Sequence, residues 1–222
     1  GTGTPDIANL LAIADLFQIS VDELLSNEKS EKKQSDYIYE SRTEYDIDGK
    51  KNFDIKLGGA YAVDLKAYHG EKIEVAMFSN VYKNLLADYK VKIDDIKNRI
   101  DIDLNRFNEA SEADAKESLV ITIFIPVKYI GKIELSVNAR TLNITDIENG
   151  HIEVNGKISE VTLQGNKSEI EIDSNLDMQI SVLSHEGALE INQLSATSRL
   201  TIPADYRFRS TKKGIATHIY YE

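Results

Sequence analysis

The stretch Leu142–Leu163, LNITDIENGHIEVNGKISEVTL, decides the fold class. It sets pairs of aliphatic residues at alternate positions and separates them by polar residues and by the dipeptides Asn149-Gly150 and Asn155-Gly156. Alternation with period two is typical of strands buried on one face, and Asn-Gly marks a tight turn. The stretch therefore predicts short β-strands, each followed by a turn.

The same pattern continues through the C-terminal part of the chain. Seven aliphatic pairs follow one another at steps of 10, 9, 9, 10, 9 and 11 residues: Leu142/Ile144, Ile152/Val154, Val161/Leu163, Ile170/Ile172, Ile180/Val182, Leu189/Ile191 and Leu200/Ile202. This spacing fits either a meander sandwich or a solenoid. Its regularity favours a flattened β-solenoid with two strands per coil of about 19 residues. The end of such a stack needs a cap, for which Tyr206, Phe208, Ile219 and Tyr220 are suited.

Alternating apolar residues also run from Tyr37 to the start of this repeat. They predict half-buried strands around Phe53–Leu57, Ala62–Leu65, Ile73–Met77, Val91–Ile93, Ile100–Leu104 and Leu119–Val127. Residues Glu109–Glu117 are rich in Ala and Glu and predict a helical turn or an exposed loop. We therefore assign residues 37–222 to one mainly β, solenoid-like domain.

Composition narrows the function classes. The chain has a net charge of −11. It contains no cysteine, and this absence excludes disulfides, thiolate metal sites and a cysteine nucleophile. No clustered Lys/Arg surface is present, so the sequence in hand lacks the charge pattern of nucleic-acid binding. No run reaches the roughly 20 apolar residues of a membrane helix, and the first ten residues do not resemble a signal peptide. We expect a soluble, cytoplasmic protein with no membrane association.

The first 27 residues have a different, helical pattern. Thr4 and Pro5 begin a helix, and Ser20 with Glu23 forms a capping box for a second helix. The apolar stripe at helical spacing consists of Ile7, Leu10, Leu11, Ala14 and Phe17, with Leu24 in the second helix. Residues 28–36 are polar and charged, and predict a linker.

The string from Gly3 to Leu25 resembles the last two helices of Cro/CI-type (Xre-family) helix-turn-helix domains. It has the Pro-Asp helix start, the Leu-x-x-x-Ala-Asp-x-Phe pattern and the Ser-x-Asp-Glu-Leu-Leu ending in order. The resemblance implies a truncated DNA-binding domain at residues 1–27, whose DNA-reading helices would precede Gly1. Only Thr2 and Thr4 would then lie near the DNA backbone. The alternative is that two amphipathic helices merely cap another domain.

The β region resembles a second family, the bacterial "putative adhesin" β-solenoids of unknown function. The resemblance rests on the strand LVITIFIP at Leu119–Pro126 and on the Ile/Val-x-Ile/Val coils that follow, and it covers about Phe53 to Glu222. It implies a β-solenoid fold.

Catalytic and metal sites are not expected. The histidines His69, His151, His185 and His218 lack metal-ligand spacing. The carboxylate pairs Asp101/Asp103 and Glu169/Glu171 would share a strand face, as in carbohydrate-cleaving β-helices, but Lys, Asn and Gln occupy the same faces. We therefore interpret them as part of a solvated strand face beside the buried Ile positions. We expect no enzyme, no cofactor and no metal.

The sequence predicts the first of three functions as the main one, with the second as its alternative. The first is a dimeric DNA-binding transcriptional regulator that contacts DNA through helices absent from this chain, and whose β domain serves oligomerisation, ligand sensing or contact with a protein partner. The second is an adhesin-like structural β-solenoid without DNA binding. The third is a polysaccharide-active β-helix.

Overall fold

The computed structural model describes residues 37–108, 110–214 and 218. The two predicted helices of residues 1–27 and the linker at 28–36 lie outside the described residues. So do the site residues assigned to the helix-turn-helix region: Thr2, Thr4, Ile7, Leu10, Leu11, Ala14, Phe17 and Leu24.

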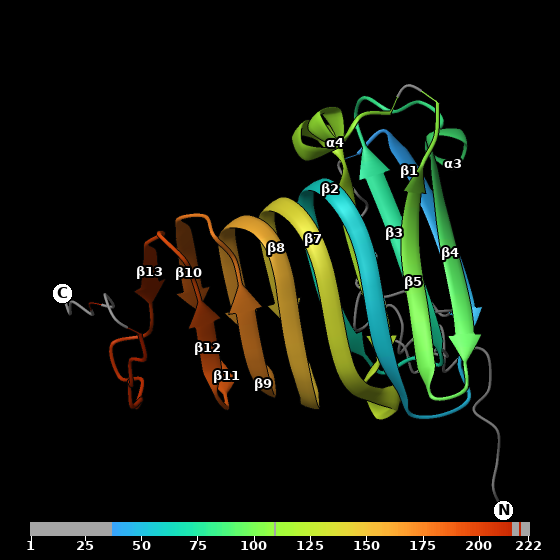
Figure 1. Cartoon of the computed structure of the whole chain (residues 1–222). Coiled ribbons are helices and arrows are strands. Elements are labelled where there is room, and N and C mark those ends of the chain that lie inside the picture. The colour runs from blue at the N-terminus through green and yellow to red at the C-terminus, as the bar shows by residue number, and fades with distance from the viewer. Residues whose placement is uncertain (1–36, 109, 215–217, 219–222) are drawn as a thin grey trace, which may run out of the picture.

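The described chain is mainly β. Its thirteen strands belong to one sheet that does not close, and they are arranged side by side along the molecule (Figure 1). The strands are β1 (Tyr39–Asp46), β2 (Lys51–Tyr68), β3 (Lys72–Ser79), β4 (Tyr89–Ile96), β5 (Arg99–Arg106), β6 (Val120–Pro126), β7 (Ile130–Thr145), β8 (Glu148–Gln164), β9 (Asn166–Asp173), β10 (Met178–Val182), β11 (His185–Glu186), β12 (Leu189–Asn192) and β13 (Ser198–Thr201). The short helices are α3 (Leu85–Asp88) and α4 (Glu112–Ser118), with a 3-10 turn, η1 (Val127–Tyr129).

The N-terminal part contains antiparallel strands, whereas the C-terminal part is parallel. Strand β3 pairs antiparallel with β1 and β6, and β4 pairs antiparallel with β5. From β2 onward, the strands β2, β7, β8, β9, β10, β12 and β13 pair with one another in parallel. A meander would need antiparallel hairpins between successive strands, and none of these pairs is one.

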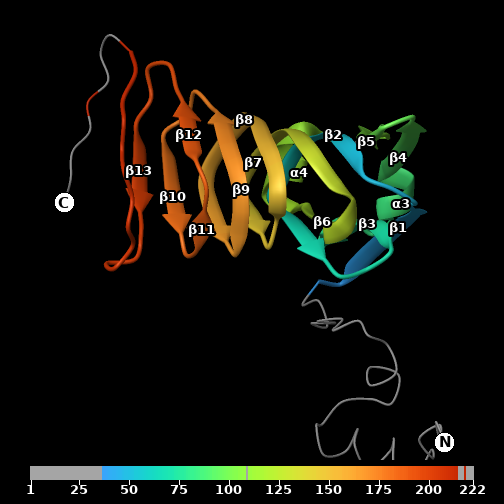
Figure 2. The ribbon, with the colours of Figure 1, turned by 90° about the horizontal axis from the view of Figure 1, so that it is seen from below.

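From β7 onward, parallel partners are separated by close to 19 residues, whereas β2 pairs with β7 across about 80 residues, as in Phe53 with Ile133. Ile133 pairs with Ile152 and Leu142 with Val161, in both cases 19 positions later. The long strands β2, β7 and β8 bend, so that one half of each lies in one wall and the other half in the opposite wall (Figures 1 and 2). The predicted separate strands at Phe53–Leu57 and Ala62–Leu65 are therefore two halves of the single strand β2.

Glycine permits the bend. Gly58, Val137 and Gly156 are register partners on β2, β7 and β8, and the two glycines have positive φ angles of 68° and 149°. A Cβ added to Gly156 would lie 1.7 Å from the Val137 carbonyl oxygen. The prediction of a tight turn at Asn155-Gly156 is wrong, because the chain bends there while remaining paired on both sides.

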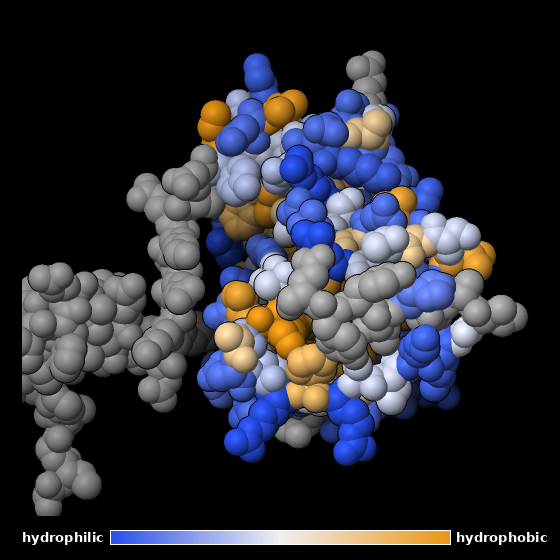
Figure 3. All heavy atoms as spheres, turned by 90° about the vertical axis from the view of Figure 1, so that its left-hand side faces the viewer, coloured by the Kyte–Doolittle hydropathy of each residue, from blue (hydrophilic) through white to orange (hydrophobic). Residues whose placement is uncertain are grey.

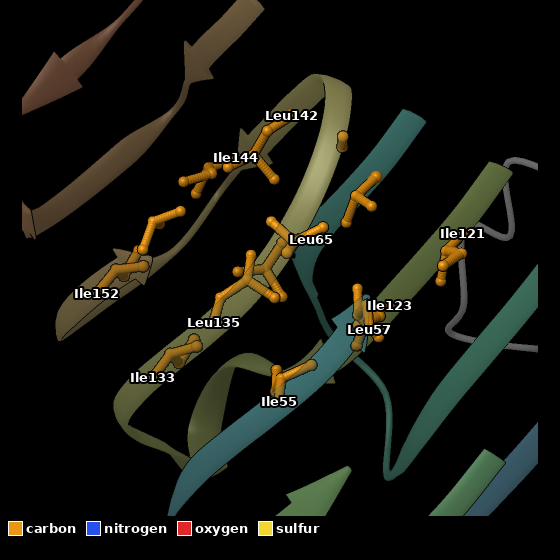
Figure 4. Close-up of a cluster of buried hydrophobic side chains, with 14 of the residues drawn as sticks. Ile55, Leu57, Leu65, Ile121, Ile123, Ile133, Leu135, Leu142, Ile144 and Ile152 are labelled. Atoms are coloured by element: carbon orange, nitrogen blue, oxygen red, sulfur yellow. The ribbon is translucent and has the colours of Figure 1, made fainter. Parts of the chain in front are cut away.

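Aliphatic side chains fill the narrow space between the walls (Figure 4). Five of the seven predicted inward pairs are buried to 5% exposure or less, from Leu142/Ile144 to Ile180/Val182. The last two pairs differ: Leu189 and Ile191 are half-buried, and Leu200 is 44% exposed. The core thus opens toward its C-terminal end.

Side chains at the corners connect one repeat to the next. Asn166 is buried; its Oδ1 accepts a hydrogen bond from the Ile147 N–H (3.0 Å), and its Nδ2 donates to the Ile144 carbonyl (2.8 Å). Asn138 and Asn175 each accept a hydrogen bond from the backbone N–H located 19 residues later. These bonds satisfy backbone groups that the corners withdraw from strand pairing.

Helix α4 confirms the helical option for the Ala/Glu-rich stretch. The Ser111 hydroxyl caps it by accepting a hydrogen bond from the Asp114 N–H at 3.1 Å. Glu112 accepts a hydrogen bond from Asn138 at 2.9 Å, which lowers the pKa of its carboxyl group. The helix is thereby fixed against the bend of β7.

Candidate functional site

One face of the sheet carries a row of acidic residues, one per strand across seven strands. The members are register partners of one another: Asp94, Asp101, Asp54, Glu134, Glu153, Glu171 and Glu190, on β4, β5, β2, β7, β8, β9 and β12. Adjacent strands lie about 4.8 Å apart, so like charges would repel along this row if they were not compensated. We call it the carboxylate row.

Cations from neighbouring positions neutralise most of the row. Lys56 pairs with Asp54 at 2.8 Å and Arg99 with Asp101 at 2.6 Å. Lys132 bridges two strands, at 2.8 Å from Glu134 and 2.9 Å from Glu153. These hydrogen bonds raise the pKa of Lys132, and those from Lys132 and Asn155 lower the pKa of Glu153.

The compensation weakens toward the C-terminal end. Glu171 accepts a hydrogen bond from Asn192 at 2.8 Å and lies 3.8 Å from the ring of His151, which also lies 3.6 Å from Glu169. Glu190 has no ion pair within 4 Å in the part of the chain that the structure describes. The row therefore ends in carboxylates without a permanent cation.

The face of the opposite wall has a different chemistry. Its central row consists of small polar residues in register: Thr122, Asp64, Asn143, Thr162, Ser181 and Thr201. Asp64 accepts hydrogen bonds from Thr122 at 3.3 Å and from Asn143 at 2.7 Å. Only one member of this row is charged, in contrast to the carboxylate row.

The carboxylates considered as catalytic candidates belong to the charged face. Asp101 is paired with Arg99, and Asp103 lies two positions further along the same strand. Glu169 and Glu171 lie beside His151 on an exposed strand surface. The Asp101 side chain is 16% exposed, whereas the Glu169 side chain is 71% exposed.

The histidines are dispersed, as the sequence predicts. His69 is exposed in the turn after β2, and His151 belongs to the charged face. His185 is buried, which lowers its pKa, and its backbone N–H donates to the Tyr206 hydroxyl at 3.1 Å. Within the described ranges, no three His, Asp or Glu side chains converge on a position for a metal ion.

Two hollows open on the described surface. One, of about 540 Å³, is lined by Tyr82, Asp88, Asn108 and Ala110 near α3. The other, of about 460 Å³, lies at a corner between β8 and β11 and is lined by Gly150, Lys167, Ser168, Glu169, Glu186 and Gly187. The Tyr82 and Tyr89 hydroxyls beside the first hollow are buried, and burial, together with the neighbouring Tyr82 hydroxyl, raises the pKa of Tyr89.

Part of the terminal cap predicted from the sequence is present. Tyr206 packs against the core and binds the His185 N–H through its hydroxyl, whereas Phe208 is 55% exposed. Ile219 and Tyr220 lie outside the described residues. The partial exposure of Leu189 and Ile191 on β12 was not predicted from the sequence. Their position near the end of the repeat could have indicated it.

Comparison with protein-family models and with curated proteins gave no match. Among solved structures, one similar chain is a "putative cell adhesion protein" from Clostridium sporogenes, with 8% identity over 74% of this chain and 100% of that chain and a TM-score of 0.46. Others are "putative adhesins" from Parabacteroides merdae (11% identity, 73% and 95% coverage, TM-score 0.29) and Bacteroides fragilis (10% identity, 75% and 98% coverage, TM-score 0.28). At these TM-scores we base no conclusion on the likeness.

The comparisons give no support to the predicted DNA-binding regulator. In the described ranges, no helix combines the length and the apolar character that crossing a membrane requires.

Proposed function

We propose that residues 37–222 form a β-solenoid that works as a binding module for an extended macromolecular partner, in the manner of an adhesin-like domain, and that the domain is not an enzyme. The proposal rests on one observation above all. Successive strands pair in parallel at offsets close to 19 residues, so that each position of the repeat becomes a straight row of side chains along the molecule. Such rows suit partners that lie along a surface better than they suit small molecules.

The interior supports this interpretation. The space between the walls is filled by aliphatic side chains exposed by 5% or less, which leaves the outer faces and the ends as places for a ligand. Most carboxylates of the charged face are held by Lys132, Arg99 and Lys56 in ion pairs that stabilise the stack. Carboxylates held in this way are organised for surface charge and not for proton transfer.

A binding panel with the full chain tests the proposal. We expect saturable binding to at least one extended polymer, such as a bacterial cell-wall polysaccharide, mucin, collagen or fibronectin, measured by biolayer interferometry at two salt concentrations. If the charged face is used, higher salt weakens binding because exposed charges are screened. Turnover of a polysaccharide that is lost in the Glu169→Gln/Glu171→Gln variant would contradict the proposal and favour an enzyme.

A second candidate is the effector half of a transcriptional regulator, which the helical pattern of residues 1–27 favours. The coding sequence just upstream of Gly1 discriminates the two candidates. A helix-turn-helix there, with operator binding by the longer protein, would support the regulator, whereas a signal peptide would contradict it.

A further inference from the structure

Strand β12 has no second strand paired on its outer side in the described part of the chain, although the segment that follows β13 reaches this end, where the Tyr206 hydroxyl accepts a hydrogen bond from the His185 N–H of β11. In the described part of the chain, β12 pairs only with β9, in parallel. The Ala188 and Asn192 carbonyls accept hydrogen bonds from the β9 side, at 2.9 and 3.2 Å. Because alternate residues of a strand point their backbone groups to opposite sides, the N–H and C=O groups of Leu189 and Ile191 point away from β9.

The same edge has an apolar side that an added strand would cover. Leu189 and Ile191 are only half-buried, whereas their register partners Ile170 and Ile172 are 1% and 0% exposed. Leu194, two residues after the strand, is 74% exposed. Figure 3 views this end of the molecule and shows apolar side chains gathered among polar ones.

The charge at the edge selects the occupant. Glu190 ends the carboxylate row, with Glu171 beside it in register and Glu186 exposed on the neighbouring strand β11. Upstream in the row, Asp54 and Asp101 each face a Lys or Arg from the same strand. Lys132 of β7 also reaches across to Glu153 of β8 at 2.9 Å, and a strand added at β12 with a cation in register would reach Glu190 in the same way.

A second copy of the chain does not meet this condition. When β12 pairs antiparallel with another β12 in the register that keeps Leu189 and Ile191 together on one face, Glu190 lies opposite Glu190. Like charges directly opposite one another destabilise a strand pair. Proteins commonly protect edge strands with Pro, with charged side chains such as Lys, or by keeping the strand short; β12 contains no Lys or Pro, but it has four residues and carries Glu190.

We propose that the β12 edge binds an extended peptide segment of a partner protein in which aliphatic and basic residues alternate. The inference rests on the proposed binding function, and it specifies the class of partner. The peptide adds one strand, its aliphatic side chains cover Leu189 and Ile191, and a basic side chain pairs with Glu190. Backbone hydrogen bonds supply affinity and the charge row supplies selectivity, as in other cases of strand addition.

Fluorescence anisotropy with the full chain and labelled synthetic octapeptides tests this proposal. The probe alternates Val and Lys, and the matched control alternates Pro and Lys, which keeps the charge but cannot pair as a strand. We expect the Val-Lys peptide to bind at least about tenfold more tightly than the Pro-Lys peptide. Equal affinity would show charge attraction alone and would overturn the proposal.

Two variants locate the site, and one serves as control. Glu190→Lys reverses the charge at the edge, and Ile191→Pro removes an outward N–H without touching a bond to β9; each should weaken Val-Lys binding at least about tenfold. Glu160→Lys makes the same charge change on the opposite wall and should leave binding unchanged. Thermal unfolding by circular dichroism shows whether each variant is folded. If Ile191→Pro is unfolded, the affinity of Glu190→Lys for the Val-Lys peptide alone tests the edge.

The remaining outcomes are also decisive. Val-Lys binding that both edge variants leave unchanged overturns the edge assignment but leaves the binding module standing. Absence of binding to this peptide, while a polymer of the panel binds, overturns only the inference, and absence of all binding overturns the proposed function as well. Binding that appears only after truncation at Ile202, which removes Tyr206 and the residues after it, assigns the edge to the chain's own C-terminal segment and overturns the proposal of a separate partner.

Discussion

Replacing the buried corner residue Asn166 with alanine should destabilise the domain strongly. The side chain makes two hydrogen bonds to backbone groups of the preceding repeat, the Ile147 N–H and the Ile144 carbonyl, and it is 1% exposed. Asn166→Ala leaves both groups buried without a partner. An unsatisfied buried polar group costs about 1–3 kcal/mol, so the free energy of unfolding should fall by about 2–6 kcal/mol.

Urea unfolding followed by circular dichroism measures this loss as a lower midpoint with an unchanged m value. Asn143→Ala is the matched control, because Asn143 is half-buried and makes one bond, to the Asp64 carboxylate, which keeps its bond from Thr122; we expect it to cost about 1.5 kcal/mol, the lower end for a bond to a charged group. Equal losses in the two variants, or a loss below about 0.5 kcal/mol in Asn166→Ala, would refute the role of the corner asparagine.

Three further predictions concern the bend, the core and pH. Gly156→Ala should prevent normal folding, because the new Cβ would lie 1.7 Å from the Val137 carbonyl oxygen; a soluble variant with native circular dichroism would contradict this. Ile152→Ala in the closed core should lower the free energy of unfolding by about 2–5 kcal/mol, and Ile191→Ala at the open end by clearly less; equal costs in urea would exclude an open end. Burial lowers the pKa of His185 below its ordinary 6.5, so the unfolded chain takes up the proton more readily, and the stability that neutral His185 contributes is complete above pH 6.5 and is lost as the pH falls below it. His185→Asn should therefore flatten the decline of the urea midpoint between pH 7 and pH 5, and an unchanged slope would show that another group titrates.

The repeat itself could be predicted from the sequence, because inward positions must be aliphatic and must recur with the pairing offset. The pairs from Leu142/Ile144 to Ile180/Val182 are buried as the alternation predicts. The length of the strands could not be predicted in the same way. A strand that bends at Gly58 or Gly156 keeps its pairing. Glycine is also typical of turns at which the chain reverses, and the alternation of apolar residues does not discriminate a bend within a strand from such a turn.

The carboxylate row could not be predicted from the sequence alone. Asp94, Asp101, Asp54, Glu134 and Glu190 become neighbours only through the strand order, which brings β5 beside the first half of β2 and β7 on its other side. Alternation places each of them outward, but the partner of each strand depends on long-range pairing. The open edge of β12 is equally a property of the assembled sheet.

Deleting one repeat tests the central claim most directly. If the parallel region is a β-solenoid, removing residues 147–165, which is 19 residues, joins Asp146 to Asn166 and lets β7 pair with β9 and β10 through the same inward rows. Urea and thermal unfolding should then show a cooperative transition, less stable than that of the full chain, with a strand-rich circular dichroism spectrum. Deletion of residues 147–156, half a repeat, should abolish cooperative folding because it places inward residues in the wrong wall. Equal behaviour of the two deletions would contradict the account.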